Sequence, residues 1–499
     1  MPMRKELLVA ALATAATLVV AAAALRRWKQ RKQWQLKQAH RILRKFAREC
    51  ATPVPKLWQI ADDLESDMRA SIASNGASPN ASLKMLVSYA DAFPNGDEEG
   101  FYYGVNLRGT NFLILCARLG GKNAPISDIH REEISIPPNV MNGNSEDLFD
   151  FIAVEVGKFV SAHPENVYEP VKRTELGFTL SYPVDDVAAS LGNVIKWNSF
   201  SADDTVAKNM VNNINQALNK HGVNLRVSAM VDDTVGNLAG GRYYCRDSVA
   251  AITLGMGTNA AYIESAQELG HLNGPSPTSR EMGVSMEWGN FRSPHLPITE
   301  FDASLDSESL NPGSQVFQKL VSGTYLGEIV RRVLVKMAQE TLLFGDPVPP
   351  KLMTPYVLRS PDMAAMHQDT SEDREVVHEK LKEIFGITDS TPMAREIVAE
   401  VCDVVSERAA RLAGAGIVGI VKKLGRIENK RNIVTVEGGL YEHYRVFRNY
   451  LNSSIWEMLG NELSDNVIVE HSHGGSGAGA VFLASSQKEN FDFEHFNIE

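Results

Sequence analysis

The sequence has few cysteines, and none of them are paired. Cys50, Cys116, Cys245 and Cys402 are the only cysteines among 499 residues, and no two of them form a C-x-x-C pair. Zinc sites and the disulfide frameworks of small secreted domains need more cysteines at closer spacing, so the pattern excludes both. The usage favours a reducing compartment.

Two familiar phosphate-binding signatures are also absent. The chain has no G-x-x-x-x-G-K-[ST] loop and neither the H-R-D nor the D-F-G motif of protein kinases. These absences exclude the P-loop NTPases and the protein kinases as relatives. His471 and His473 flank one serine without a further ligand at metal-site spacing, so no metal site is predicted there.

Acidic residues outnumber basic ones in the chain as a whole, but not at its N-terminal end. The formal net charge is −11, yet residues 1–48 contain twelve Lys and Arg and a single acid, Glu6. An acidic body is a poor binder of nucleic acid, so no nucleic-acid partner is expected. The basic end needs a separate explanation.

One long hydrophobic run explains the basic end. Leu7 to Leu25 consists only of Ala, Leu, Val and Thr, and about 20 apolar residues cross a bilayer. Basic residues follow the run more densely than they precede it, which predicts a body that faces the cytosol. We expect residues 1–30 to form a membrane-anchor helix with a basic flank. A cleaved signal peptide is the alternative, because Ala21 to Ala24 could form a cleavage site.

Helical and strand patterns alternate along the rest of the chain. Helical spacing from Trp34 to Met68 is interrupted at Pro53 and Pro55, and helices dominate again beyond Leu320. Strands are predicted at 102–107, 112–119, 177–184, 227–233 and 249–255, strands with a glycine turn at 434–439 and 467–475, a helix at 203–220 and a loop at 71–82. This interleaving predicts an α/β protein with two cores, and no internal repeat is visible in the sequence.

Glycine-rich turns follow several of these strands. They read NLRGTN (106–111), LGMGTN (254–259), EGG (437–439) and GGSGAG (474–479). Glycine permits positive φ and close backbone approach, so such turns can present N–H groups to phosphate oxygens. One such turn alone is more often an ordinary turn, but the set favours a nucleotide site. Its expected residues are Asn106, Arg108, Gly109, Thr110, Asn111, Gly255, Gly257, Thr258, Gly438, Gly439, Gly475, Ser476 and Gly477.

From about Trp34 to Ala484 the chain resembles plant-type hexokinases. The most specific stretches are MEWGNFRSPHLPITEFD (286–302), SLNPG (309–313), YLGEIVRRVL (325–334), DTVGNLAGGRYY (233–244) and ARLAGAGIVGIVKKLGR (410–426). The resemblance implies a two-lobed actin-like ATPase and sugar kinase fold with a ribonuclease H-like motif. It also implies a small domain at 34–236, a large domain at 237–488, and hexose (glucose first), ATP and ATP-carried Mg²⁺ as ligands. The N-terminal span resembles the membrane-anchored branch of the family, which implies the mitochondrial outer membrane.

The resemblance also assigns the sugar site. It implies that Asp233 is the general base that accepts the proton of the hexose 6-hydroxyl. The family's sugar-contacting positions are occupied by Ser181, Asp232, Asn259, Glu287 and Gln318. Without the family, Asp233 would be interpreted as a helix N-cap and Glu287 as a surface or cap acid.

The chain departs from the family pattern at several of these positions. Asn106 replaces an Asp that supports the magnesium hydration shell, and Arg108 replaces a turn glycine. A non-glycine residue at a positive-φ turn costs about 1 kcal/mol if that geometry is kept, although Arg108 could instead supply positive charge to phosphate. Further departures are Leu113 for an arginine, Asp232 for an asparagine, Met256 for a threonine, Gln318 for a glutamate, and a lysine missing from the loop IKWNSF (195–200).

These departures affect the expected activity. Removing one charge-stabilising donor commonly lowers turnover about 100- to 1000-fold. We therefore predict a hexokinase-like protein with weak or lost catalysis and a sugar-sensing or regulatory role, with protein partners that the sequence does not identify. An active hexokinase that phosphorylates glucose and related hexoses at the 6-hydroxyl is the alternative.

Overall fold

The computed structural model describes most of the chain beyond the N-terminal end. The described residues are 26, 34, 37–73, 81–87, 90, 92–164, 174–181, 204–269, 281–428 and 430–487. Within these ranges no helix combines the length and apolar character needed to cross a bilayer. The predicted anchor at 1–30, apart from residue 26, and the loop at 195–200 lie outside the described residues.

By compactness the chain divides into two units. Unit 1 comprises residues 1–51, 297–301 and 327–405, and unit 2 comprises 52–296, 302–326 and 406–499. Every described strand belongs to unit 2. The described part of unit 1 is helical, and its helical segments are 37–50, parts of α8 (Glu300–Glu308), α10 (Gly323–Thr341) and α13 (Pro392–Lys423), and all of η3 (Pro350–Met353), α11 (Ser360–His367) and α12 (Glu375–Phe385).

A buried ion-pair network in α10 holds the chain segment at Tyr356 of unit 1. The side chain of Glu328 is fully buried and accepts hydrogen bonds from Arg331 at 2.6 and 2.7 Å and from Arg332 at 2.8 Å. The backbone N–H of Tyr356 donates to the same carboxylate at 2.8 Å. A buried charge needs such partners, so the motif at 325–334 has a structural role here.

The first sheet of unit 2 has five strands. Their order is β4 (Ser127–Ser135), β3 (Asn111–Gly120), β2 (Glu99–Leu107), β5 (Thr174–Leu180) and β6 (Leu225–Asp232). β3 is antiparallel to both of its neighbours, and β2, β5 and β6 are parallel. One face packs on α4 (Ser145–Ala162) and α6 (Asp204–Lys220) in a core of aliphatic and aromatic side chains.

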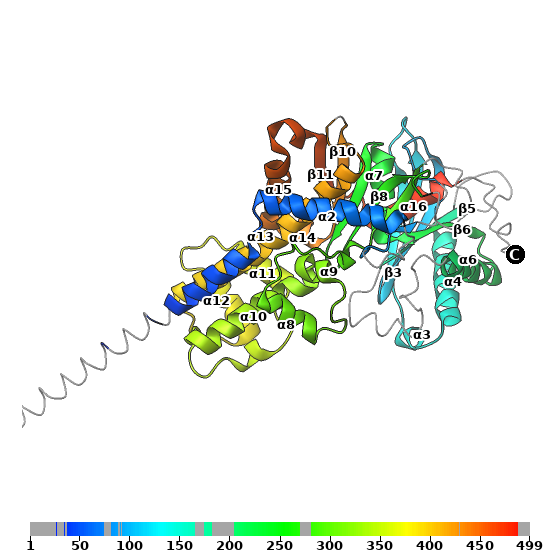
Figure 1. Ribbon diagram of the computed structural model, residues 1–499. Coiled ribbons are helices and arrows are strands. Elements are labelled where there is room, and N and C mark those ends of the chain that lie inside the picture. The colour runs from blue at the N-terminus through cyan, green and yellow to red at the C-terminus, as the bar shows by residue number, and fades with distance from the viewer. Residues whose placement is uncertain are drawn as a thin grey trace, which may run out of the picture. The chain divides into compact units, whose positions relative to one another are not determined.

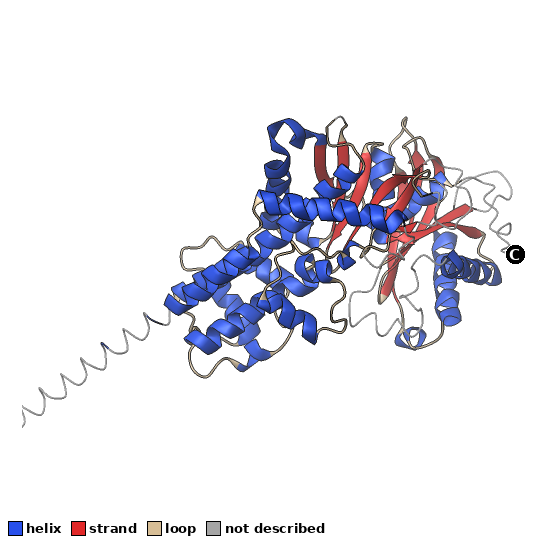
Figure 2. Ribbon diagram, viewed as in Figure 1, coloured by secondary structure: helices blue, strands red, loops and turns tan. Residues whose placement is uncertain are grey.

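The second sheet repeats this topology. Its order is β1 (Leu86–Val87), β9 (Glu281–Ser285), β8 (Thr258–Ser265), β7 (Ser248–Leu254), β10 (Asn432–Glu437) and β11 (Val467–His471). Without the short β1, three antiparallel strands are followed by two parallel ones, as in the first sheet. The sheet topology is therefore duplicated although the sequence shows no repeat. Figure 2 shows the strands of the two sheets in red. Further described helices of unit 2 are α2 (Val54–Ala73), α3 (Pro138–Met141), η2 (Trp288–Asn290), α9 (Val316–Val321), α14 (Gly439–Glu442), α15 (Arg445–Leu463) and η4 (Ser464–Asn466).

Two crossing helices connect the sheets. α7 (Asp233–Tyr244) directly follows β6 of the first sheet but packs on β7, β8 and β10 of the second. α16 (Gly475–Ser486) follows β11 of the second sheet but packs on β2, β3 and β5 of the first (Figure 1). The helices touch where a Cβ on Gly479 would lie 1.8 Å from the carbonyl oxygen of Gly236. This exchange brings the first turns of α7 and α16 together.

Alternation along β2 explains which side chains reach α16. Val105 and Leu107 point into the core with α4 and α6, so Gly104 and Asn106 point to the opposite face. A Cβ on Gly104 would lie 2.9 Å from the Cβ of Ala480, so glycine lets α16 lie close to the sheet. Asn106 is thereby directed at the first turn of α16.

Most predicted elements are present, with small corrections at their ends. The helical pattern is interrupted near Pro53 as predicted, because α2 begins at Val54. The loop expected from residue 71 is wrong for its first three residues, since α2 continues to Ala73. There Ser71 donates a hydrogen bond to Asp67 at 3.1 Å, so its polar side chain is satisfied inside the helix. The last predicted residues of the strand at 177–184 lie outside the described part.

Candidate functional site

Asp232 and Asp233 have different roles at the start of α7. The carboxylate of Asp232 is the N-cap and accepts the backbone N–H groups of Thr234 at 2.7 Å and Val235 at 3.0 Å. The N-cap role that the local sequence suggested for Asp233 is therefore filled by Asp232. The carboxylate of Asp233 is left to face the end of β2.

The carboxylate of Asp233 accepts two side-chain hydrogen bonds. Asn106 donates from Nδ2 to Oδ1 at 2.5 Å, and the hydroxyl of Ser181 donates to Oδ2. Ser181 is held by its own backbone N–H, which donates to the carbonyl of Leu107 at 2.8 Å. The amide of Asn106 also lies 2.7 Å from Thr179 Oγ1 and 3.2 Å from Ser476 Oγ. The structure therefore brings together four predicted site residues: Asn106, Ser181, Asp233 and Ser476.

Arg108 continues this network in the first glycine turn. Its Nε donates to Asn106 Oδ1 at 2.7 Å, and its backbone N–H donates to the carbonyl of Asn111 at 2.8 Å. Because arginine can only donate, the oxygen of the Asn106 amide faces Arg108 and the nitrogen faces Asp233. Arg108 is not among the described residues with positive φ, so the expected backbone strain is not present. Gly109 also lacks positive φ, and the carbonyl of Thr110 accepts the N–H of Ile136 at 2.9 Å.

The turn before α16 uses glycine as predicted. Gly474 and Gly475 have φ of 83° and 69°. The backbone N–H of Ser476 in the first helical turn donates to Glu437 Oε2 at 3.2 Å. A Cβ on Gly477 would lie 2.8 Å from the side chain of Leu113, so this glycine is needed for packing. The positive N-terminal end of α16 thus already has an anionic neighbour, which the sequence did not identify.

Glu437 is a site residue that sequence reasoning missed. It is the last residue of β10 and directly precedes Gly438, whose φ is 117°. A Cβ on Gly438 would lie 2.4 Å from the carbonyl of Leu254, so the second and third glycine turns lie against each other. The available signal was the acidic residue placed immediately before a glycine pair at a strand end.

The second glycine turn has less unusual backbone. The N–H of Gly255 donates to the carbonyl of Gly257 at 3.0 Å, and neither glycine has positive φ. Met256 at the tip is 63% exposed, and its carbonyl accepts both the N–H and the hydroxyl of Thr324. A backbone hydrogen bond closes the turn, so its glycines allow close approach of neighbouring backbone and are not needed for positive φ.

Thr258 is already fully bonded inside the protein. Its hydroxyl donates to the carbonyl of Thr253 and accepts the indole N–H of Trp288, both at 2.9 Å. Its backbone N–H donates to Gln318 Oε1 at 3.0 Å. The hydroxyl proton expected to reach phosphate is therefore committed to a backbone acceptor in this structure.

Asn259 and Glu287 lie together beside β9. Asn259 Nδ2 donates to Ser285 Oγ at 2.9 Å and lies 3.5 Å from Glu287 Oε1. Ser285 is also a hydrogen-bond partner of Asp232, which links this pair to the start of α7. Glu287 has φ 54°, a left-handed conformation that is rare for a side chain of this kind. Backbone strain of this type is common where a side chain must be held at a binding site.

Burial raises the pKa of several of these carboxyl groups. The pKa of Asp232 is raised to about 6, and those of Glu287 and Glu437 to about 7, chiefly because burial disfavours the charged form. Burial also raises the pKa of Asp233, against the opposing effects of Ser181, Asn106 and Arg108. Clustered carboxyl groups with raised pKa values are typical of functional sites.

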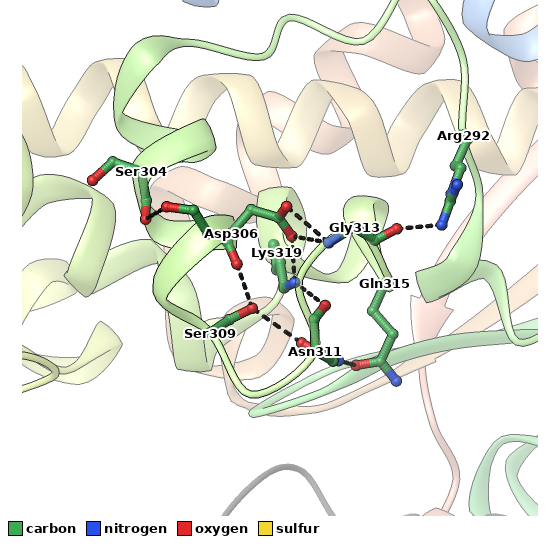
Figure 3. A network of polar contacts seen from close by, with 9 residues as sticks. Arg292, Ser304, Asp306, Ser309, Asn311, Gly313, Gln315 and Lys319 are labelled. Atoms are coloured by element: carbon green, nitrogen blue, oxygen red, sulfur yellow. Dashed lines mark hydrogen bonds and ion pairs between the residues drawn. The ribbon is translucent and has the colours of Figure 1, made fainter.

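A polar loop supports the short helix that carries Gln318. Lys319 donates to Asp306 Oδ1 at 2.5 Å and to the carbonyl of Asn311 at 2.9 Å (Figure 3). Asp306 also accepts the N–H of Gly313 at 2.9 Å, and Asn311 donates to Gln315 at 2.8 Å. These hydrogen bonds hold Asn311 and Gly313 of the motif at 309–313 against the residues that flank it.

Comparison with known proteins identifies the family behind this arrangement. Two family models described as hexokinase match residues 42–243 and 249–486. Hexokinase-1 of Spinacia oleracea is 48% identical over 494 residues, which cover 98% of this chain and 99% of the relative. The chain belongs to the hexokinase family. Hexokinase-1 of Arabidopsis thaliana is also 48% identical, over 95% of this chain and 96% of that protein.

Solved structures agree with the fold of this hexokinase family member. A hexokinase from Schistosoma mansoni complexed with glucose has a TM-score of 0.74 at 28% identity, covering 91% of this chain and 99% of that one. Another hexokinase crystal structure has a TM-score of 0.75 at 25% identity, covering 90% and 99%. The predicted two-lobed α/β sugar kinase fold is confirmed.

Proposed function

We propose that this protein binds a hexose, glucose first, and ATP, with weak or no phosphoryl transfer to the 6-hydroxyl and a sugar-sensing or regulatory role. Glucose follows from the family and from the glucose complex of the Schistosoma mansoni relative. The polar side chains of Asn259 and Glu287, linked through Ser285 to Asp232 at the start of α7, suit a ligand rich in hydroxyl groups. ATP follows from the family and from the glycine turns around Asn106 and Ser476.

The observation that carries weak catalysis is the hydrogen bond from Asn106 to Asp233. A general base must offer a lone pair to the sugar hydroxyl proton. A donated hydrogen bond stabilises the carboxylate and lowers its proton affinity, whereas the aspartate of the family at position 106 would raise it by like-charge repulsion. Exchanging that aspartate for an amide therefore makes Asp233 a weaker base.

The test compares binding with turnover in the full-length protein. Calorimetry is expected to show glucose binding, while coupled ADP release with glucose, fructose and mannose stays at least about 100-fold below a typical turnover of about 10 per second. Asp233→Asn removes the proposed base and should abolish any residual turnover, while Glu379→Gln at an exposed position is the matched control that should bind glucose like the unaltered protein. Turnover near 10 per second in the unaltered protein would establish the alternative, an active hexokinase. Failure to bind any of the three sugars would refute the proposal.

Membrane attachment is a separate proposal. Its support is the apolar run Leu7 to Leu25 with its denser basic flank on the C-terminal side. Residues 1–30 fused to a fluorescent protein should reach an organelle membrane facing the cytosol, with the mitochondrial outer membrane expected first. Replacing Leu12 and Leu18 by Arg should release the reporter. A diffuse or secreted reporter from the unaltered segment would contradict the proposal.

A further inference from the structure

We infer that the guanidinium group of Arg108 takes the place of magnesium at the phosphate end of the site, so that the protein binds ATP without a divalent metal. The inference rests on the proposed nucleotide binding and adds to it the chemical form of the ligand: free ATP instead of the metal complex. Its basis is the geometry around Asn106, Asp233 and Glu437.

Arg108 lies near carboxylates from both halves of the duplicated fold. Its Nε donates a hydrogen bond to Asn106 Oδ1 at 2.7 Å, and Asn106 Nδ2 donates in turn to Asp233 Oδ1. Burial raises the pKa values of Asp233 and Glu437, and the positive charge of Arg108 lowers both of them. Both carboxylates are therefore close enough to interact electrostatically with Arg108. Asp233 follows the first sheet and Glu437 ends a strand of the second. The guanidinium group of Arg108 in the turn at 106–111 therefore lies near Glu437 of the turn at 437–439.

The residues of the site do not fit a protein-supported magnesium ion. Mg²⁺ prefers six oxygen ligands, commonly waters with one or two carboxylates. At position 106 the side chain is an amide whose oxygen already accepts from Arg108. Glu437 Oε2 accepts from Ser476, and both oxygens of Asp233 have donors. The described residues contain no group of three or more His, Cys, Asp or Glu able to hold a metal ion.

The same arrangement fits a phosphate group. A guanidinium is always charged, and its planar fork donates two parallel hydrogen bonds to phosphate oxygens. Only Nε of Arg108 is used by Asn106, and no described residue accepts from its two terminal nitrogens. Those nitrogens can donate to phosphate while Arg108 offsets the repulsion from Asp233 and Glu437.

Calorimetric titration of the full-length protein with ATP tests the inference. We expect dissociation constants in EDTA and in excess Mg²⁺ to agree within about threefold. Arg108→Gln keeps a donor for Asn106 but removes the charge, so it should weaken binding in EDTA about tenfold or more and make added Mg²⁺ favourable. The ATP affinity of Arg108→Lys in EDTA should lie between those of the unaltered protein and Arg108→Gln, because lysine keeps the charge but lacks the planar guanidinium fork.

Arg246→Gln is the matched control. Arg246 is an arginine 60% exposed that pairs with Asp97 at 3.1 Å, and its replacement should leave ATP binding unchanged. The inference is overturned if the unaltered protein needs Mg²⁺ for ATP, if Arg108→Gln binds ATP in EDTA like the unaltered protein, or if ATP does not bind in either condition. Glucose titration of the same samples separates the outcomes, since glucose binding without ATP binding refutes this inference while leaving hexose binding intact.

Discussion

Single carboxyl groups determine much of the chemistry expected of this site. Asp232 is buried and Glu287 and Glu437 are partly buried, and burial raises the pKa of Asp232 to about 6 and those of the two glutamates to about 7. A carboxyl group whose pKa rises on folding binds protons more tightly in the folded state. Its stabilising effect is therefore complete below its ordinary pKa and is lost as the pH rises through the folded value. We expect the free energy of unfolding to decrease between about pH 4.5 and pH 7 because of these groups.

Glucose affinity is predicted to increase with pH. Sugar hydroxyls donate to an ionised carboxylate, and burial raises the pKa of Glu287 to about 7, so only the ionised fraction is ready to bind. Between pH 6 and pH 8 that fraction changes about tenfold, and the affinity should follow it. Calorimetry at pH 6, 7 and 8 measures the effect. Glu287→Gln should bind weakly with little pH dependence, while Glu379→Gln at an exposed position should behave like the unaltered protein. A flat profile in the unaltered protein would show that Glu287 does not accept from the sugar.

At the scale of elements, the crossing of α7 and α16 positions the site. Asn106 and Ser476 are 370 residues apart in the chain, yet their side chains lie 3.2 Å apart. This approach depends on glycine at the crossing, because a Cβ on Gly479 would lie 1.8 Å from the backbone oxygen of Gly236. Glycine at positions 236 and 479 lowers the intrinsic helix propensity but allows the two helices to pack closely.

Gly479→Ala is predicted to destabilise the protein and to weaken ATP binding. The added methyl group must push α16 away from α7, and overpacking of this kind costs about 1–3 kcal/mol. Urea denaturation measures the loss. Gly240→Ala is the control in α7, because the nearest atom to its new Cβ is 3.6 Å away and alanine favours a helix. Equal stabilities of the two variants would show that the crossing is not tightly packed.

The loop that supports Gln318 depends on a salt bridge. Burial alone would raise the pKa of Asp306, but bonds from Lys319 and Gly313 hold it below its ordinary value. Lys319 is only 5% exposed, so the pair is partly desolvated. Removing one partner leaves the other without its counter-charge.

Lys319→Met is therefore predicted to lower stability by about 1–3 kcal/mol and to weaken glucose binding through Gln318. Thermal denaturation and glucose calorimetry measure the two effects. The control is Lys336→Met, whose lysine pairs with the exposed Glu300 at 2.7 Å and should cost less than about 1 kcal/mol. Unchanged glucose affinity in a destabilised Lys319→Met protein would limit the loop to a structural role.

At the scale of the whole molecule, the duplicated sheets and crossing helices of the described residues form a sugar kinase framework. The same framework is present in solved hexokinases with TM-scores of 0.74 and 0.75. Weak turnover would therefore result from individual side chains and not from a lost element. That distinction can be tested by restoring the family's residues.

The combined repair is predicted to recover phosphoryl transfer. It consists of Asn106→Asp, Arg108→Gly, Asp232→Asn and Gln318→Glu, with Thr-Lys-Gly replacing Asn198 and Ser199. Each change alone should do little, because groups that act on one transition state work as a unit. The N-cap of α7 should survive, since asparagine caps as well as aspartate. Coupled ADP release measures the gain, which should be about 100-fold or more. Adding Asp233→Ala should abolish it, and a repaired protein without turnover would refute the residue-level explanation.

The sequence by itself determined the local features of this protein. Short apolar runs specified the strands, and glycine after a strand marked the turns at Gly438 and Gly475, where positive φ is present. The resemblance carried by the motif beginning at Asp233 correctly identified the family. Such features depend on neighbours within a few residues, so they can be recognised without a fold.

Only the tertiary structure decided how these pieces combine. The repeated topology, the exchange of α7 and α16 between sheets, and the pairing of Glu437 with Ser476 all depend on contacts between distant segments. The sequence suggested strain at Arg108, but the turn closes with ordinary φ and the side chain bonds Asn106. Side-chain partners across hundreds of residues are chosen by packing, and packing has no periodic signature in the sequence.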